Sequence, residues 1–192
     1  MRQIITRFLM LTALAALPLL NGCVAALVGG AVAGGYLAGE DRRPASTLSD
    51  DQAIEFKISN RITEKFPQAH VNSTSYNRLV LLTGEAPNAE VKAEIEKLVK
   101  EVPSVRGTYN EIVVGPSTAL SDRTRDSLLT SKVKARFVDR RKFNAVHVKV
   151  VTEREVVYLM GIVKPQEADD ATEIARTTEG VKRVVRVFEV QG

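Results

Sequence analysis

The sequence predicts an α+β fold built from two tandem copies of one small domain. The first observation is an internal repeat, in which residues 71–86 align without a gap on residues 148–163 and place Leu82-Thr83-Gly84 over Leu159-Met160-Gly161. The second is that helical and strand-like apolar spacings follow each other in the same order in both halves. Each copy is therefore predicted to run helix, strand, strand, helix, strand, with a three-stranded mixed sheet packed against two helices.

Each copy begins with a predicted amphipathic helix. Apolar residues recur every four positions behind short polar residues that are typical helix caps. The stripes are Ile54, Ile58 and Ile62 in the first copy and Leu129, Val133 and Phe137 in the second, with cap candidates Ser49, Asp50, Ser121 and Asp122.

Two predicted strands follow in each copy, joined by a short polar turn that suits a hairpin. The second strand of each pair is a continuous apolar run, which is typical of a strand covered on both faces. The strands are 71–75 and 79–84 in the first copy and 146–152 and 156–163 in the second.

A second helix and a last strand close each copy. A helix between two strands allows them to pair in parallel through a crossover. The helix stripes are Val91, Ile95, Leu98 and Val102, and Ala171, Ile174 and Thr178; the last strands are 107–114 and 182–190.

The N-terminus carries an export signal. Arg2 and Arg7 precede an apolar segment over residues 8–20, which is too short to span a bilayer. The run Leu20-Asn21-Gly22-Cys23 then resembles the lipobox of bacterial lipoproteins, which implies a signal peptide over residues 1–22 and a diacylglyceryl (palmitate-type) lipid anchor on Cys23. Val24, where inner-membrane lipoproteins often carry Asp, favours the outer membrane. An ordinary secretory signal with a chance cysteine is the alternative.

Residues 23–49 are predicted to be a lipidated, Gly/Ala-rich tether and linker. Only about 15 residues there are apolar, and a helix of that length reaches roughly 22 Å, short of the ~30 Å hydrocarbon core. Two Gly-x-x-x-Gly spacings leave a spanning or oligomerising role as an alternative. The two copies are then assigned to residues 50–117 and 118–192.

Charge is divided unevenly between the copies. The net charge is +4, and it falls when the basic signal peptide is removed. Residues 46–117 carry more acidic than basic side chains, whereas residues 118–192 carry 15 basic and 11 acidic ones. The second copy is therefore the one suited to an anionic surface. Export and the lack of stacking aromatic residues in the basic stretch argue against nucleic acid.

The lipobox together with two such copies resembles the DolP-like dual BON-domain lipoproteins. The closest motifs lie in the second copy: Thr130-Ser131-Lys132-Val133-Lys134, Val157-Tyr158-Leu159-Met160-Gly161 and Gly180-Val181-Lys182-Arg183-Val184. The resemblance implies a lipid-anchored outer-membrane protein that faces the periplasm and supports envelope integrity without enzymatic activity. It also implies binding of anionic phospholipid such as phosphatidylglycerol through the first helix of the second BON domain, and a place at the division site. A protein-binding adaptor that docks on the outer-membrane protein assembly machinery is the alternative function.

The first helix of the second copy carries the candidate lipid-binding residues. From Asp122 to Lys142 stand eight basic side chains against three acidic ones, and Leu128 lies beside the core stripe. Near an anionic bilayer each basic residue contributes about 1 kcal/mol, and an exposed leucine among them could insert into the lipid. The predicted set is Arg125, Leu128, Leu129, Lys132, Val133, Arg136 and Phe137.

Catalytic and metal-binding patterns are missing from the sequence. His70 and His147 occupy equivalent positions, but without further Cys or clustered carboxylates they do not supply the ligands of a zinc site. We therefore expect no metal, no cofactor and no small-molecule substrate.

Overall fold

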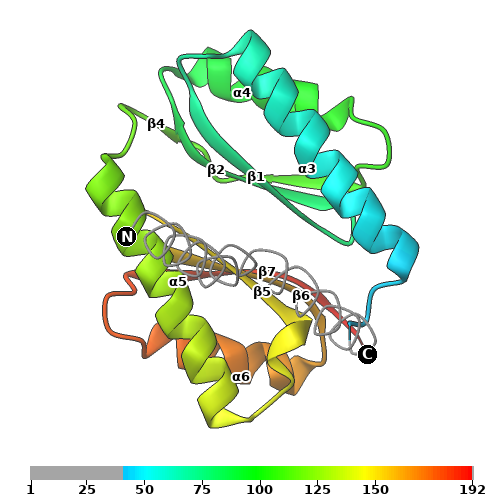
Figure 1. Cartoon of the computed structure of the whole chain (residues 1–192), viewed down its shortest axis with the longest axis vertical. Helices are drawn as coiled ribbons and strands as arrows, with labels where there is room; N and C mark the ends of the chain where they lie inside the picture. Colours follow the sequence, from blue (N-terminus) through cyan, green and yellow to red (C-terminus); the bar gives the residue numbers. More distant parts are fainter. Residues whose placement is uncertain (1–40, 192) are drawn as a thin grey trace, which may run out of the picture. The chain divides into compact units, whose positions relative to one another are not determined.

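Two sheets, each with helices on one face, make up residues 41–191, the part of the chain that the computed structural model describes (Figure 1). The first copy contains α3 (Ala45–Lys65), β1 (His70–Tyr76), β2 (Leu79–Ala86), α4 (Ala89–Lys100), β3 (Gly107–Asn110) and β4 (Val113–Val114). The second contains α5 (Leu120–Arg140), the short 3-10 helix η2 (Ala145–His147), β5 (Val148–Glu153), β6 (Val156–Val163), α6 (Pro165–Arg176) and β7 (Arg183–Val190). The predicted α+β class and element order are confirmed. Cys23 and the rest of the predicted signal and tether up to Glu40 lie outside the described residues.

Both sheets are mixed, as predicted. In the first, β1 pairs antiparallel with β2, and β2 pairs in parallel with β3 and then with β4. In the second, β5 pairs antiparallel with β6, and β6 pairs in parallel with β7 along its whole length, from Val156 opposite Arg183 to Val163 opposite Val190. The helix between the last two strands of each copy provides the crossover that parallel pairing requires.

The last strand of the first copy is broken where the sequence predicts one strand over 107–114. Ile112 turns inward and is buried, its N–H donates to the side chain of Asn110 at 3.3 Å, and its carbonyl oxygen accepts from Lys92 Nζ at 2.6 Å. The local side-chain bonds replace the sheet ladder at this point. In the second copy the predicted strand from Val146 begins instead with η2, because the Asn144 side chain accepts from the Val146 N–H.

The first helices begin earlier than the predicted caps. α3 begins at Ala45 behind Pro44, and α5 begins at Leu120 behind Ala119, with no side-chain cap on either helix. Ser49 and Asp50 therefore lie inside α3, and Ser121 and Asp122 inside α5. The sequence predicts a linker up to Ser49, but residues 45–49 are helical and belong to α3.

Each β-hairpin turn is held by a buried aspartate from the preceding first helix. Asn77-Arg78 and Arg154-Glu155 all have positive φ, between 51° and 64°, as a two-residue turn of the primed type requires. Asp51 accepts from both N–H groups of the first turn at 2.9 and 2.7 Å, and Asp126 accepts from both of the second at 2.8 and 2.9 Å. Neither role was predicted from the sequence.

The central strands are covered on both faces, as their apolar runs predict. Alternate residues of β2 pack against α3 and α4, and alternate residues of β6 pack against α5 and α6. The opposite faces share a third cluster, formed by Tyr76, Leu81, Tyr158, Met160, Ile162 and Val187. The second face of each sheet is therefore covered by the other copy, which the sequence did not reveal.

Candidate functional site

Helix α5 has one buried face and one exposed face. Its buried residues are Asp126, Leu129, Val133 and Phe137, and the Phe137 ring meets that of Phe143 edge-on at 5.0 Å between centroids. Burial of a large apolar side chain stabilises a fold by roughly 1.5–3 kcal/mol. This stripe holds α5 on the second sheet and turns its other side to the surface.

The structure divides the seven predicted lipid-binding residues into two groups. Leu129, Val133 and Phe137 are buried, the last two within the core cluster of the second copy. Lipid could reach them only if α5 left the sheet. Leu128, in contrast, is 67 % exposed. The predicted set is thus narrowed to the residues that reach the surface, Arg125, Leu128, Lys132 and Arg136.

Arg136 has a structural task within the second copy. Its Nη1 donates to the Ile174 carbonyl at 3.0 Å and to the Thr178 hydroxyl at 2.7 Å, and its Nη2 donates to the Thr177 hydroxyl at 3.2 Å. These bonds satisfy backbone and side-chain groups at the C-terminal end of α6. Arg136 fastens α5 to α6, so its replacement would disturb the fold as well as the surface charge.

Arg125 and Lys132 make ion pairs on the surface. Arg125 pairs with Asp122 at 3.2 Å on the same helix, and Lys132 pairs with Glu179 at 2.8 Å. Lys132 also lowers the pKa of the Glu179 carboxyl, chiefly through its hydrogen bond. Exposed pairs of this kind contribute about 0–1 kcal/mol. Both cations can therefore exchange their partners for phosphate at little cost.

The predicted set left out two exposed apolar residues of α5 and several of the eight basic residues counted between Asp122 and Lys142. Leu120 is 76 % exposed and Val138 is 64 % exposed, one near each end of the helix. Within residues 41–191, no ion pair or hydrogen bond engages the side chains of Lys134, Arg140, Arg141 or Lys142, which are all exposed. The sequence contained a signal for Val138. This residue directly follows Phe137 at one end of the core stripe, just as Leu128 directly precedes Leu129 at the other end.

Helix α3 shows how the same element looks without this surface. Its buried stripe matches that of α5 at an offset of 75 residues, and two of its cations, Lys57 and Arg61, match Lys132 and Arg136. The differences lie on the exposed face, where α5 gains positive charge and two apolar side chains, whereas α3 has the exposed Phe56 where α5 has Ser131. The differing pairs are Asp50 and Arg125, Ala53 and Leu128, Ser59 and Lys134, and Thr63 and Val138.

The two histidines lie beside carboxylates in equivalent places. His70 Nδ1 is 3.2 Å from Glu85 Oε2, and His147 Nδ1 is 3.9 Å from Glu167 Oε1. Glu85 is buried, which raises its pKa, but hydrogen bonds from Thr118 and His70 outweigh burial and the pKa lies below its usual value. No group of three or more potential metal ligands occurs in the described part of the chain.

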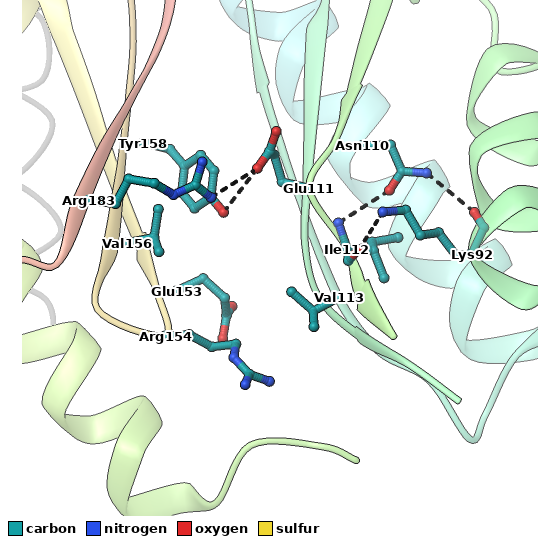
Figure 2. A pocket seen from close by; sticks show the side chains of 10 residues that line it. All are labelled: Lys92, Asn110, Glu111, Ile112, Val113, Glu153, Arg154, Val156, Tyr158 and Arg183. Atoms are coloured by element: carbon teal, nitrogen blue, oxygen red, sulfur yellow. Dashed lines mark hydrogen bonds and ion pairs between the residues drawn. The ribbon is translucent and has the colours of Figure 1, made fainter. Parts of the chain in front are cut away.

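A cleft of about 400 Å³ opens where the two copies meet (Figure 2). Arg183 and Tyr158 of the second copy point toward Glu111 of the first, each at 3.5 Å from Glu111 Oε2, the upper limit of a hydrogen bond (Figure 2). Burial, followed by the charge of Glu111, raises the pKa of Tyr158 to about 12. A tyrosine that stays protonated at neutral pH is a poor general base, and the lining of this cleft contains no Ser, Thr, Cys or His side chain.

Comparison with known proteins supports the repeat and the family. The BON domain model matches residues 50–116 and 125–192. The chain is 41% identical over 175 residues to the outer membrane lipoprotein DolP of Haemophilus influenzae, covering 88% of this chain and 89% of that protein. It is 32% identical to the 21 kDa hemolysin of Actinobacillus pleuropneumoniae, covering 77% of this chain and 78% of the other.

The comparison with solved structures is much weaker. A structure of CdsD from the type III secretion system of Chlamydia trachomatis covers 75% of this chain and 92% of its own at 13% identity, with a TM-score of 0.30. That likeness is too low to carry an argument. None of the helices between Asp41 and Gln191 has the length and apolar character of a membrane span. The tandem BON match and the identity to DolP over most of both chains show that this chain belongs to the BON-domain family as a DolP-like dual BON lipoprotein.

Proposed function

We propose that this protein is a non-enzymatic outer-membrane lipoprotein, anchored through Cys23 and facing the periplasm, whose second BON domain binds anionic phospholipid. The binding surface consists of the exposed face of α5, with Leu120, Leu128 and Val138 as its apolar residues. Its cations are Arg125, Lys132, Lys134 and Arg140 of α5, together with Arg141 and Lys142, which directly follow the helix. In this role the protein supports envelope integrity, and the lipid surface selects the place where the anchored protein settles, such as the division site.

The observation that supports this proposal is the contrast between α5 and α3 on equivalent backbones. The segment from Asp122 to Lys142 has a net charge of +5, whereas Asp50 to His70 has −1. Each basic residue close to an anionic bilayer contributes about 1 kcal/mol, and burial of one leucine contributes roughly 1.5–3 kcal/mol. Three or four cations and one inserted leucine therefore suffice for measurable binding without the anchor.

The test uses a fragment that begins at Asp41, because residues 41–192 form one compact unit and the anchor's own affinity is then absent. Binding to vesicles is measured with and without phosphatidylglycerol. We expect binding only to the anionic vesicles, and a decrease as salt rises. Leu128→Glu and Lys134→Glu should each weaken binding at least about ten-fold, which corresponds to 1.4 kcal/mol. Arg136 is left unchanged because it fastens α5 to α6.

The matched control lies on the first copy. Phe56 is 68 % exposed on α3, so Phe56→Glu adds the same negative charge at an exposed apolar site of the other first helix. We expect this variant to bind as the unmodified fragment does. Equal binding to neutral and anionic vesicles, or an equal loss in Phe56→Glu and Leu128→Glu, would contradict the proposal.

Phe56 also supports the second candidate function, that of an adaptor docking on the outer-membrane protein assembly machinery. An exposed aromatic residue on an otherwise polar helix face is a common anchor for a protein partner. On this reading localisation in cells follows the partner. It would then survive Lys134→Glu and be lost in Phe56→Glu, the reverse of the pattern for lipid.

A further inference from the structure

The first residues that the structure describes bind both BON domains. Arg42 donates from Nη1 and Nη2 to the two carboxylate oxygens of Glu167, at 2.6 and 2.8 Å, and from Nη1 to the Ile162 carbonyl at 2.8 Å. Glu167 lies in the first turn of α6 and Ile162 lies in β6, so all these acceptors belong to the second copy. The parallel two-bond geometry is the strongest arrangement between a guanidinium and a carboxylate.

The next residue binds the first copy. Arg43 Nη1 lies 2.8 Å from Asp51 Oδ2, and its guanidinium stacks 3.9 Å from the centre of the Tyr76 ring. Asp41 Oδ2 accepts from Arg43 Nη2 at 2.8 Å and keeps the side chain in place. Tyr76 itself belongs to the apolar cluster that joins the two sheets. Two consecutive arginines therefore hold opposite domains at one edge of their shared interface.

These contacts are shielded from solvent. The side chains of Arg42, Arg43, Glu167 and Asp51 all have at most a fifth of their surface exposed. The Arg42 hydrogen bond lowers the pKa of the Glu167 carboxyl to about 2. Removal of one partner of such a pair leaves a shielded charge without compensation, which is costly, and the pair therefore defines one arrangement more strictly than an exposed ion pair does.

We propose that Arg42 and Arg43 form a clasp that fixes the two BON domains against each other and sets the point at which the anchor segment leaves them. The clasp itself follows from the contacts of residues 41–43. Only its consequence for membrane binding rests on the proposed function. The lipid-binding helix α5 then has a fixed orientation relative to the base of its own tether.

The clasp also shortens the free tether. Without the clasp, the free chain would run from Cys23 to Pro44, just before α3, and would extend over roughly 70 Å at most, whereas a tether that ends at Asp41 extends over roughly 60 Å at most. A shorter tether and a fixed exit favour contact of α5 with the membrane that holds its own anchor. The arginines act as positioning residues for that contact and do not touch the lipid.

The experiment measures the distance between the domains in the full mature chain in detergent micelles. Spin labels are placed at Ser59→Cys on α3 and Ser131→Cys on α5, two exposed helical positions, while Cys23 is occupied by lipid. We expect a single narrow distance peak, and its loss in the double variant Arg42→Ala, Arg43→Ala. Arg42→Lys keeps the charge but not the two-bond geometry, and should broaden the peak less.

The control is Arg176→Ala. Among residues 41–191, Arg176 pairs only with Glu173 of its own helix, so its loss should leave the peak narrow. A peak that stays equally narrow in the double variant would overturn the clasp. Circular dichroism identifies a variant that has unfolded. If the double variant has unfolded, the width of the distance peak in Arg42→Lys tests the clasp instead. If the peak broadens but vesicles with phosphatidylglycerol are not bound by any form, the clasp stands and the proposed function fails.

Discussion

Gly84 in the first BON domain and Gly161 in the second occupy equivalent places on the central strands, and so do Tyr76 and Glu153 at the ends of the neighbouring strands. The glycines share one task. A Cβ atom at either would lie within 2.3 Å of the backbone oxygen of the equivalent histidine, His70 or His147. Tyr76 and Glu153 share no chemistry, although both are buried where the two domains meet. The two copies therefore keep the glycine that the close backbone approach requires, but they differ in the side chains at the interface.

This variation makes the two ends of the interface chemically different. At the end containing Tyr76, Arg42 and Arg43 bind the two domains, and the Arg43 guanidinium stacks on the Tyr76 ring. At the end containing Glu153, burial raises the pKa of that carboxyl; a hydrogen bond from Asn72 at 3.2 Å opposes the shift, and the nearby Glu85 and Asp126 add to it. The interface thus has one end where arginines pair with carboxylates and one end where a buried carboxylate lies near other carboxylates.

The largest effect is expected from filling the two close approaches. Gly84→Ala places a Cβ 2.1 Å from the His70 oxygen at a φ of +104°, whereas Gly161→Ala meets the His147 oxygen at 2.3 Å without a positive φ. Steric overlap costs about 1–3 kcal/mol, and the strained φ adds about 1–3 kcal/mol at Gly84 alone. In urea unfolding, Gly84→Ala should therefore have a lower free energy of unfolding than Gly161→Ala. Gly115→Ala, with no atom within 4 Å, should be neutral, and equal losses at both sites would contradict the comparison.

A smaller effect is expected from the hairpin aspartates. Asp51→Ala removes bonds to two N–H groups, to the Ser75 hydroxyl at 2.6 Å and to Arg43. Asp126→Ala removes bonds to two N–H groups and to no other partner in the described part of the chain. Hydrogen bonds to a charged group contribute about 1.5–3 kcal/mol, so Asp51→Ala should cost more free energy of unfolding.

Thermal unfolding and amide exchange at Arg78 and Arg154 provide the measurement for this pair. The exposed Asp139 of α5 gives the control, and Asp139→Ala should change the free energy of unfolding by less than about 0.5 kcal/mol. A cost of Asp126→Ala above that of Asp51→Ala would show that the extra partners of Asp51 contribute nothing.

The smallest effect is a dependence of stability on pH, of opposite sign at the two ends of the interface. The raised pKa of Glu153 means that the folded state binds its proton more tightly than the unfolded state. The penalty for its charge is present at neutral pH and is relieved as pH falls through the raised pKa toward the ordinary one. Glu167, with a pKa of about 2, behaves in the opposite way: its stabilisation is complete above the ordinary pKa and is lost as pH falls toward 2.

Melting temperatures of the unmodified chain and of Glu153→Gln, measured between pH 7 and pH 4, check the first half of this prediction. The variant should melt higher at pH 7, and the difference should shrink as the solution is acidified. A difference that stays constant across this range would show that Glu153 titrates normally.

Much of the fold could be predicted because it depends on local spacing. The stripe Ile54, Ile58 and Ile62 and the run Leu79 to Leu82 indicate their elements without reference to distant residues. The candidate site was only partly predictable. Leu129, Val133 and Phe137 form the apolar stripe of the helix, and they were included because the resemblance implies binding through the first helix as a whole. Val138 was missed because helical spacing does not show how exposed the residues beside the stripe are.

The sequence by itself determined the repeat, the order of helices and strands, and the basic helix of the second copy. The elements depend on the spacing of residues that lie within a few turns of one another, and the repeat is the recurrence of these spacings in the second half of the chain. Only the tertiary structure decided that each sheet is covered by the other copy, that Arg136 fastens α5 to α6, and that Arg42 reaches Glu167, 125 residues away. Such contacts depend on how folded elements meet, and periodicity carries no information about pairs so far apart.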